Sequence, residues 1–130
     1  MKSKSLGTIF LVLTTLLFAG CRSAPVYNVS DAAFTLTGQG VTQQDIASAI
    51  MTAGRSLGWI MKEQKPGHIL ATLHLRTHTA VVDIFYGSTK YSITYKDSTN
   101  LGYDGTNIHS NYNGWIQNLS NAINAQVSNL

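Results

Sequence analysis

The sequence predicts a single α+β domain in which two amphipathic helices cover one face of an antiparallel sheet. Three observations predict it: β-like runs alternate with turn-forming residues from 59 to 96, and apolar side chains recur at helical spacing in 42–57 and again in 112–127. With a short strand before the first helix, the expected order is β-α-β-β-β-β-α. Because the helices and the sheet bury their apolar faces against one another, the opposite sheet face is expected to be partly polar.

The first strand and the first helix are both marked by their side-chain pattern. Residues 34–37 alternate apolar side chains with threonine, which predicts a short strand. The helix is expected to begin after Thr42, whose hydroxyl can accept from the backbone of Asp45, and to stop at Gly58, which suits a left-handed conformation. Its buried face is predicted to consist of Ile46, Ala49, Ile50, Ala53 and Leu57.

Four further strands are expected to form an antiparallel meander over residues 59–64, 69–76, 81–86 and 91–96. Matching the apolar side chains of the middle two strands places His74 opposite Asp83. The same matching in the next hairpin places Asp83 opposite Thr94 and leaves a tight turn at residues 88–89. In the first hairpin, an L-proline in the turn at residues 65–68 favours turn types whose twist suits a two-residue hairpin poorly, so that register is left open.

A long polar loop and a second helix complete the predicted domain. Residues 100–111 are rich in glycine, asparagine and aspartate, as is typical of a loop. The stretch that follows predicts an amphipathic helix, whose apolar face is formed by Tyr112, Ile116, Leu119, Ile123 and Val127.

The first 20 residues have the three parts of a secretory signal. Lys2 and Lys4 supply positive charge, residues 6–18 are mostly apolar, and Ala19-Gly20 are small. A membrane-spanning helix needs about 20 apolar residues, so this apolar stretch is too short to cross the hydrocarbon core. We therefore expect a signal peptide at residues 1–20 that is removed during export.

Phe18-Ala19-Gly20-Cys21 resembles the lipobox of bacterial lipoproteins, whose usual form is Leu-Ala-Gly-Cys. The resemblance implies cleavage before Cys21, a diacylglycerol attached to its sulfur through a thioether, and an acyl chain on its new amino group. Two or three acyl chains, at about 0.8 kcal/mol per buried CH₂, would hold the protein stably on a membrane. Because Arg22 rather than aspartate follows the cysteine, the resemblance also implies the periplasmic face of the outer membrane.

Residues 21–33 are expected to be the lipidated cysteine and a short tether, and residues 34–130 the folded domain. The tether is predicted because this segment shows no sustained apolar period. Cys21 is the only cysteine, so its lipidation leaves no thiol for a disulfide, an iron–sulfur cluster or nucleophilic catalysis. Residues 72–100 and 108–116 also look similar to segments of small proteobacterial lipoproteins, and this resemblance implies no activity.

The basic character of the chain belongs largely to its signal. Without Lys2 and Lys4, seven of the nine basic residues remain against six acidic ones, a net charge of +1 for residues 21–130. The remaining bases form no run. Binding to nucleic acid requires a clustered basic face, so this class of partner is not expected.

Candidate catalytic residues gather on the exposed sheet face. The predicted register aligns His74, Asp83 and Thr94 across three strands, with Arg76 and Phe85 nearby. A histidine oriented by a carboxylate can act in general acid–base catalysis, and a threonine hydroxyl can be a nucleophile. The alternative is a solvated face whose cross-strand pairs contribute about 0.2–1 kcal/mol each.

A second candidate group lies around the polar loop and the start of the last helix, where His109, Tyr112 and Trp115 suggest contact with a glycan. Aromatic rings cover the apolar faces of sugars; the alternative is that Tyr112 and Trp115 are core anchors. No metal site is expected, because the spacing of the four histidines does not converge on one ion: His68, His74, His78 and His109. No cofactor is expected beyond the acyl chains on Cys21.

These observations leave three functions open. The first is a non-enzymatic accessory or binding role at the cell envelope, with a lipid anchor in the membrane and an envelope protein as partner. The second is a module that binds peptidoglycan or another glycan through Tyr112 and Trp115. The third is a small hydrolase that uses His74 and Asp83.

Overall fold

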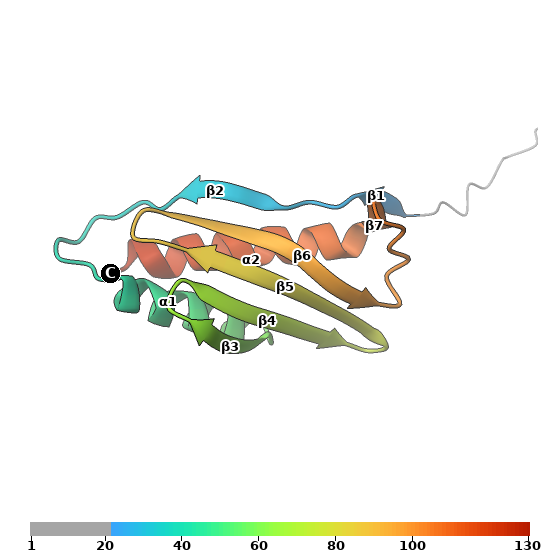
Figure 1. Ribbon diagram of the computed structural model, residues 1–130, viewed down its shortest axis with the longest axis horizontal. Helices are drawn as coiled ribbons and strands as arrows, with labels where there is room; N and C mark the ends of the chain where they lie inside the picture. The colour runs from blue at the N-terminus through green and yellow to red at the C-terminus, as the bar shows by residue number, and fades with distance from the viewer. Residues whose placement is uncertain (1–21) are drawn as a thin grey trace, which may run out of the picture.

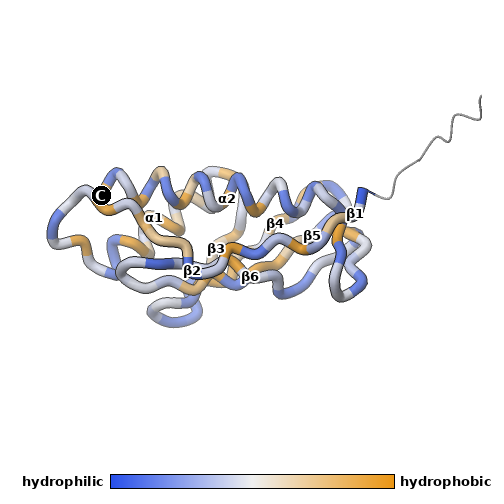
Figure 2. Tube along the Cα trace, turned by 90° about the horizontal axis from the view of Figure 1, so that it is seen from above, coloured by the Kyte–Doolittle hydropathy of each residue, from blue (hydrophilic) through white to orange (hydrophobic). Residues whose placement is uncertain are grey.

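Two layers make up the domain in the computed structural model, which describes residues 22–130. One layer is a five-stranded antiparallel sheet in the order β2-β6-β5-β4-β3, and two helices lie side by side across one of its faces (Figure 1; Figure 2). This arrangement confirms the predicted α+β class. The elements of the two layers are β2 (Val29–Ala33), α1 (Gln43–Ser56), β3 (Ile60–Lys65), β4 (His68–Leu75), β5 (His78–Tyr86), β6 (Lys90–Thr99) and α2 (Ser110–Ser128).

A separate two-stranded ladder joins the N-terminal segment to the segment that directly precedes the last helix. β1 (Ser23–Pro25) pairs antiparallel with β7 (Asn107–His109), which directly precedes α2. The backbone nitrogen of Ser110 also donates to the carbonyl of Arg22 at 2.6 Å. The β1–β7 clasp therefore fixes the first described residue to the start of α2.

Asn113, in the first turns of α2, reinforces the β1–β7 clasp with both ends of its side-chain amide. Its Oδ1 accepts from the backbone nitrogen of Tyr27 at 2.9 Å, and its Nδ2 donates to the carbonyl of Pro25 at 2.9 Å. The prediction of a tether is therefore wrong for residues 23–33, which hold β1 and β2. Both strands are too short for an apolar period to be visible in the sequence. The strand expected at 34–37 lies instead at β2, and Phe34 packs in the core.

The first helix follows its predicted signals closely. The Thr42 hydroxyl accepts from the backbone of Asp45, and the Asp45 carboxylate accepts from the backbone of Thr42, which forms a capping box. Gly58 takes the expected positive φ of 88°. Leu57 is the one predicted face residue that is not buried, because the helix ends before it. At Gly54 a Cβ would overlap the Met61 side chain, so glycine allows α1 to approach β3 closely.

The β5–β6 register was predicted correctly, and the β4–β5 register was not. Asp83 lies opposite Thr94, as expected, but Leu70 is its partner on β4 and His74 pairs with Thr79. The strands are joined by a two-residue turn in which Arg76 has a positive φ of 56°. Such turns usually carry glycine or asparagine at this position, so the sequence does not signal one here. As a result, the predicted partner of Asp83 on β4 was His74, whereas the observed partner is Leu70.

The first hairpin has a register that the sequence left open. β3 pairs with β4 so that Met61 lies opposite Ala71, and a bulge precedes the turn at Pro66-Gly67. Gly67 has a φ of 89°, which suits the third position of a type II turn. The bulge, which adds local twist, accommodates this turn in the hairpin.

The core lies between the sheet and the two helices, as the hydrophobic segments of Figure 2 indicate. The predicted apolar face of α2 is fully buried over its whole length. No helix among the described residues has both the length and the apolar character needed to span a bilayer.

Candidate functional site

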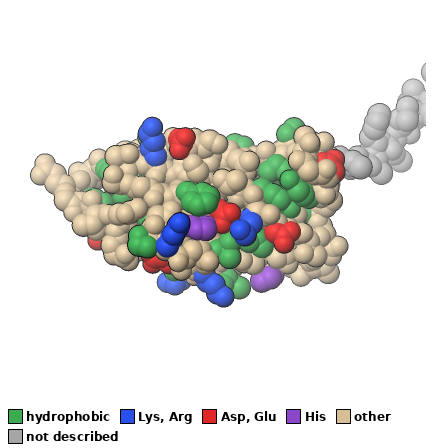
Figure 3. All heavy atoms as spheres, viewed as in Figure 1, with side chains coloured by type: hydrophobic (Ala, Val, Ile, Leu, Met, Phe, Trp, Pro, Cys, Tyr) green, Lys and Arg blue, Asp and Glu red, His purple; other side chains and the backbone are tan. Residues whose placement is uncertain are grey.

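The face of the five-stranded sheet that the helices leave uncovered is the candidate binding surface, which we call the outer sheet face. It faces the viewer in Figure 3, where hydrophobic side chains are interspersed with lysine, aspartate and histidine. Side chains alternate along a strand, and the buried positions of β4 and β5 leave their neighbours pointing outward. The outer sheet face is formed mainly by Ile60, Lys62, His68, Leu70, Val81, Asp83, Phe85, Thr94 and Lys96.

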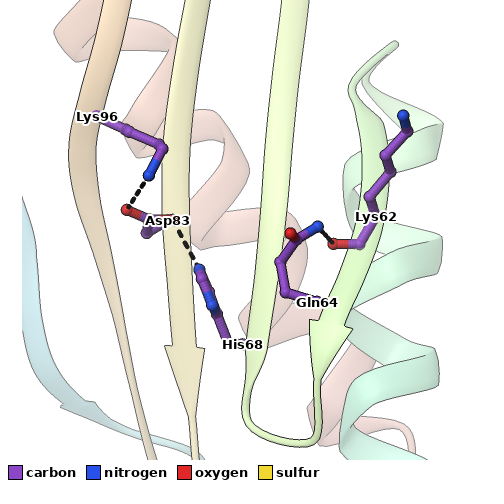
Figure 4. A network of polar contacts seen from close by, with 5 residues as sticks. All are labelled: Lys62, Gln64, His68, Asp83 and Lys96. Carbon is purple, nitrogen blue, oxygen red and sulfur yellow. Dashed lines mark hydrogen bonds and ion pairs between the residues drawn. The ribbon is translucent and has the colours of Figure 1, made fainter.

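Three charged or titratable side chains meet at the centre of the outer sheet face (Figure 4). The His68 Nε2 lies 2.7 Å from Oδ1 of Asp83, and the Lys96 ammonium lies 3.7 Å from Oδ2. They reach Asp83 from the strands on either side of it, β4 and β6. His68 and Asp83 are 20% and 16% exposed, whereas Lys96 is 52% exposed. Water therefore weakens the lysine contact more than the histidine contact.

The chemistry of this trio follows from its donors and acceptors. An ionised carboxylate only accepts hydrogen bonds, so Nε2 of His68 carries a hydrogen and donates it to Asp83. The His68 ring stacks on Phe85, with the ring centroids 4.6 Å apart and the planes at 22°. These two contacts fix the ring plane. Among the described residues, no hydroxyl lies within hydrogen-bond distance of this imidazole, so the trio contains an oriented histidine without a nucleophile beside it.

The catalytic alignment expected from the sequence is not formed. The Nδ1 of His74 lies 3.1 Å from the hydroxyl of Thr79, its partner across the hairpin, and not beside Asp83. Asp83 does lie opposite Thr94, but the histidine that contacts its carboxylate is His68. Arg76 is at the exposed tip of the β4–β5 turn, away from the position expected beside this group. All of these differences follow from the wrong β4–β5 register.

The aromatic group expected to bind a glycan lies largely in the core. Tyr112 is fully buried, and Trp115 is half-buried against the core cluster. The Nδ1 of His109 accepts from the backbone of Asn111 at 3.2 Å, so this side chain caps α2. Tyr112 is therefore a core anchor, as the alternative predicted, and its ring is not available on the surface to bind a sugar.

Tyr112 carries an unusual polar group. Its hydroxyl is buried and has no hydrogen-bond partner among the described residues. Its ring meets that of Tyr95 edge to face at 5.7 Å, and Tyr95 in turn packs against Tyr103 at 4.1 Å. Burial, followed by the charges of the two neighbouring tyrosines, raises the pKa of Tyr112 above its ordinary value of 10.0. The hydroxyl therefore stays protonated in the folded protein well into the alkaline range.

Two functional positions were missed by sequence reasoning. His68 was considered only as a metal ligand; its place beside Asp83 depends on the turn at Arg76, whose positive φ has no sequence signal. From the sequence, Asn113 belongs to the group at the start of the last helix that could contact a glycan or form turns and caps, whereas in the structure it clamps the N-terminal segment. Such a contact between distant segments leaves no local pattern.

The described residues contain no group of three or more histidine, cysteine or carboxylate side chains suited to a metal ion. Cys21, the predicted site of lipidation, lies outside the described residues. No family model, curated protein or solved structure matches the chain.

Proposed function

We propose that the protein is a bacterial lipoprotein, anchored through Cys21 in the periplasmic face of the outer membrane, with a non-enzymatic binding role. The observation that carries the proposal is the sequence of residues 1–21: a basic start, a short apolar stretch and Phe18-Ala19-Gly20-Cys21. Arg22 after the cysteine supports the outer-membrane location.

The partner surface in this proposal is the outer sheet face. Two large apolar side chains are exposed there: Phe85 on the central strand β5 is 45% exposed, and Ile60 on the edge strand β3 is 50% exposed. The apolar side chains surround a polar centre that is already paired internally, because Asp83 contacts both His68 and Lys96. An oriented histidine without an adjacent hydroxyl supports binding rather than hydrolysis.

The chemistry of the outer sheet face favours a protein partner with apolar side chains bordered by carboxylates. Lys62, Lys65 and Lys96 are exposed on this face, which also carries the carboxylates of Asp83 and Asp97. The surface thus combines apolar area with a small excess of positive charge. Burial of the apolar side chains would supply affinity, and the lysines would select the orientation of the partner.

Anchoring is tested by expressing the full chain in bacteria supplied with a labelled fatty acid. We expect the label in the wild type and its loss in Cys21→Ser, together with failure to remove residues 1–20. Mass spectrometry of the mature N-terminus identifies the acylated residue. An unacylated mature protein that begins elsewhere contradicts the proposal.

Partner binding is tested by placing a photocrosslinking amino acid at Phe85 in intact cells. Gln117, exposed on α2 at the opposite side of the domain, is the matched control position. We expect a discrete crosslinked protein from position 85 and none from position 117. Equal crosslinking at both positions, or none at either, argues against the outer sheet face as the partner surface.

A further inference from the structure

The point at which the chain leaves the described domain is fixed by hydrogen bonds. β1 begins at Ser23, only two residues after Cys21, and consecutive Cα atoms are about 3.8 Å apart. Two peptide units, about 8 Å of chain when extended, are thus all that separates Ser23 from the cysteine at position 21. Since β1 is held by β7 and Arg22 by Ser110, an anchor on Cys21 would be attached to the domain without an intervening linker.

Several segments meet at this end of the domain, which we call the anchor end. Figure 1 shows β1 and β7 there, together with the end of β6 and the turn between β4 and β5. The turn is tied to the loop that follows β6: Nδ1 of His78 donates to the carbonyl of Asn100 at 2.7 Å, and Nδ2 of Asn100 donates to the carbonyl of Thr77 at 3.0 Å. The anchor end is therefore formed by the β4–β5 turn, the loop that follows β6 and the β1–β7 ladder.

The side chains of the anchor end suit the interface between water and lipid. Tyr103 and Tyr27 are 43% and 40% exposed, and Leu75 beside the turn is 45% exposed. Tyrosine favours the headgroup region because its ring is apolar and its hydroxyl remains hydrated. The Tyr103 ring is already held against Tyr95, so little side-chain freedom is lost when it contacts lipid.

The charges of the anchor end fit a headgroup layer. Arg22 and Arg76 are both exposed, and neither takes part in an ion pair within the described part of the chain. A surface pocket of about 200 Å³ lies beside Arg22 and is also lined by Leu101 and His109. Guanidinium groups bind phosphate oxygens through paired hydrogen bonds. Asp104 and Asp97 are the nearby acids: the Asp104 carboxylate accepts from the backbone nitrogens of Thr106 and Asn107, and the Asp97 carboxylate accepts from that of Ser98.

We propose that the anchor end rests on the phospholipid headgroups, with the strands of the sheet directed away from the membrane. This inference depends on the proposed acylation of Cys21, which determines which end meets the bilayer. β6 has ten residues and spans about 30 Å, so the turn at residues 87–89 is held far from the lipid. The outer sheet face then faces sideways, toward proteins in or on the same membrane leaflet.

The orientation is tested with the acylated full chain in vesicles of phosphatidylethanolamine and phosphatidylglycerol. In the acylated protein the Cys21 sulfur is a thioether, so an introduced cysteine is the only free thiol. A fluorescent label is placed at the anchor end in Thr106→Cys or Thr77→Cys. Labels at the opposite end, in Ser88→Cys or Gln39→Cys, are the matched controls, and all four positions are exposed.

Lipids that carry a quencher on the headgroup are expected to reduce the fluorescence of the two anchor-end labels and to leave the two control labels unchanged. Equal quenching at all four positions, or stronger quenching at the control positions, overturns the orientation. Vesicle flotation and the mass of the acylated N-terminus are measured on the same samples. Protein that floats and is acylated without the expected pattern refutes the orientation alone, whereas protein that is not acylated refutes the proposed anchoring and the orientation with it.

Discussion

Replacement of Tyr112 by phenylalanine is expected to stabilise the domain. The Tyr112 hydroxyl is fully buried and makes no hydrogen bond with the described residues, so folding removes it from water without compensation. Burial of an unsatisfied hydroxyl costs about 1–3 kcal/mol, and the dispersion energy of a single oxygen atom offsets only a fraction of that. We expect Tyr112→Phe to raise the free energy of unfolding by about 1 kcal/mol, equivalent to roughly 4 °C in Tm for a domain of this size.

The assay is urea unfolding of the purified protein, followed by tryptophan fluorescence. Tyr91→Phe is the matched control, because Tyr91 is equally buried but its hydroxyl bonds with that of Ser120. The control is expected to lose about 1 kcal/mol. A loss of comparable size in Tyr112→Phe refutes the reasoning, since it would show that the Tyr112 hydroxyl has a partner in the folded protein.

The pH dependence of the same variant follows from the raised pKa of Tyr112. Because this pKa exceeds its unfolded value of 10.0, Tyr112 loses its proton in the unfolded state at a lower pH than in the folded state. Ionisation above pH 10 therefore favours the unfolded wild type and lowers its free energy of unfolding. The advantage of Tyr112→Phe over the wild type is therefore expected to widen above pH 10. An advantage that stays constant through this range contradicts the assignment of the shift to Tyr112.

Three further predictions concern the turn, the clasp and the first helix. Arg76→Gly is expected to stabilise the protein by about 1 kcal/mol in urea unfolding, because glycine accepts the positive φ, whereas Thr77→Gly, at a residue without positive φ, should destabilise it. Asn113→Ala removes two hydrogen bonds to the N-terminal segment and should speed amide exchange in residues 23–27 while leaving β4–β6 protected; unchanged exchange there contradicts the clamp. The hydrogen bond from the Thr42 backbone lowers the pKa of Asp45 below its ordinary value of 3.8, so the stability difference between wild type and Asp45→Ala should be constant above that pH and shrink as the pH falls through the lowered pKa. A difference in stability that is independent of pH rules out this role for the Asp45 carboxylate.

Local side-chain patterns were sufficient to predict both helices and one hairpin register. The capping box at Thr42 and the buried stripe of α2 depend on residues within one or two turns of each other, and both appear in the structure. Ile84 and Ile93 likewise align because a short turn joins their strands. In each case the interacting residues are close in sequence, so a single segment contains the necessary information.

The candidate site was harder to predict because it depends on a backbone conformation for which the sequence carries no signal. Arg76 adopts a positive φ, and this one turn moves the partner of Asp83 from His74 to His68. β1 was missed for a different reason. Its partner β7 is distant in the sequence, just before the last helix, and three residues in a strand are too few to show an alternation.

If the chain is exported and processed as proposed, the pairing of β1 with β7 would set an order of events during biogenesis. A chain exported N-terminus first presents residues 23–25 long before residues 107–109 have crossed the membrane. Until then β1 has no partner, and the proposed cleavage and acylation at Cys21 would act on an extended segment. Once the last part of the chain arrives, closure of the ladder brings the modified end against the finished domain. On the proposed pathway, folding would thus be completed only after maturation of the N-terminus, and the late pairing of β1 would leave the proposed processing site accessible until then.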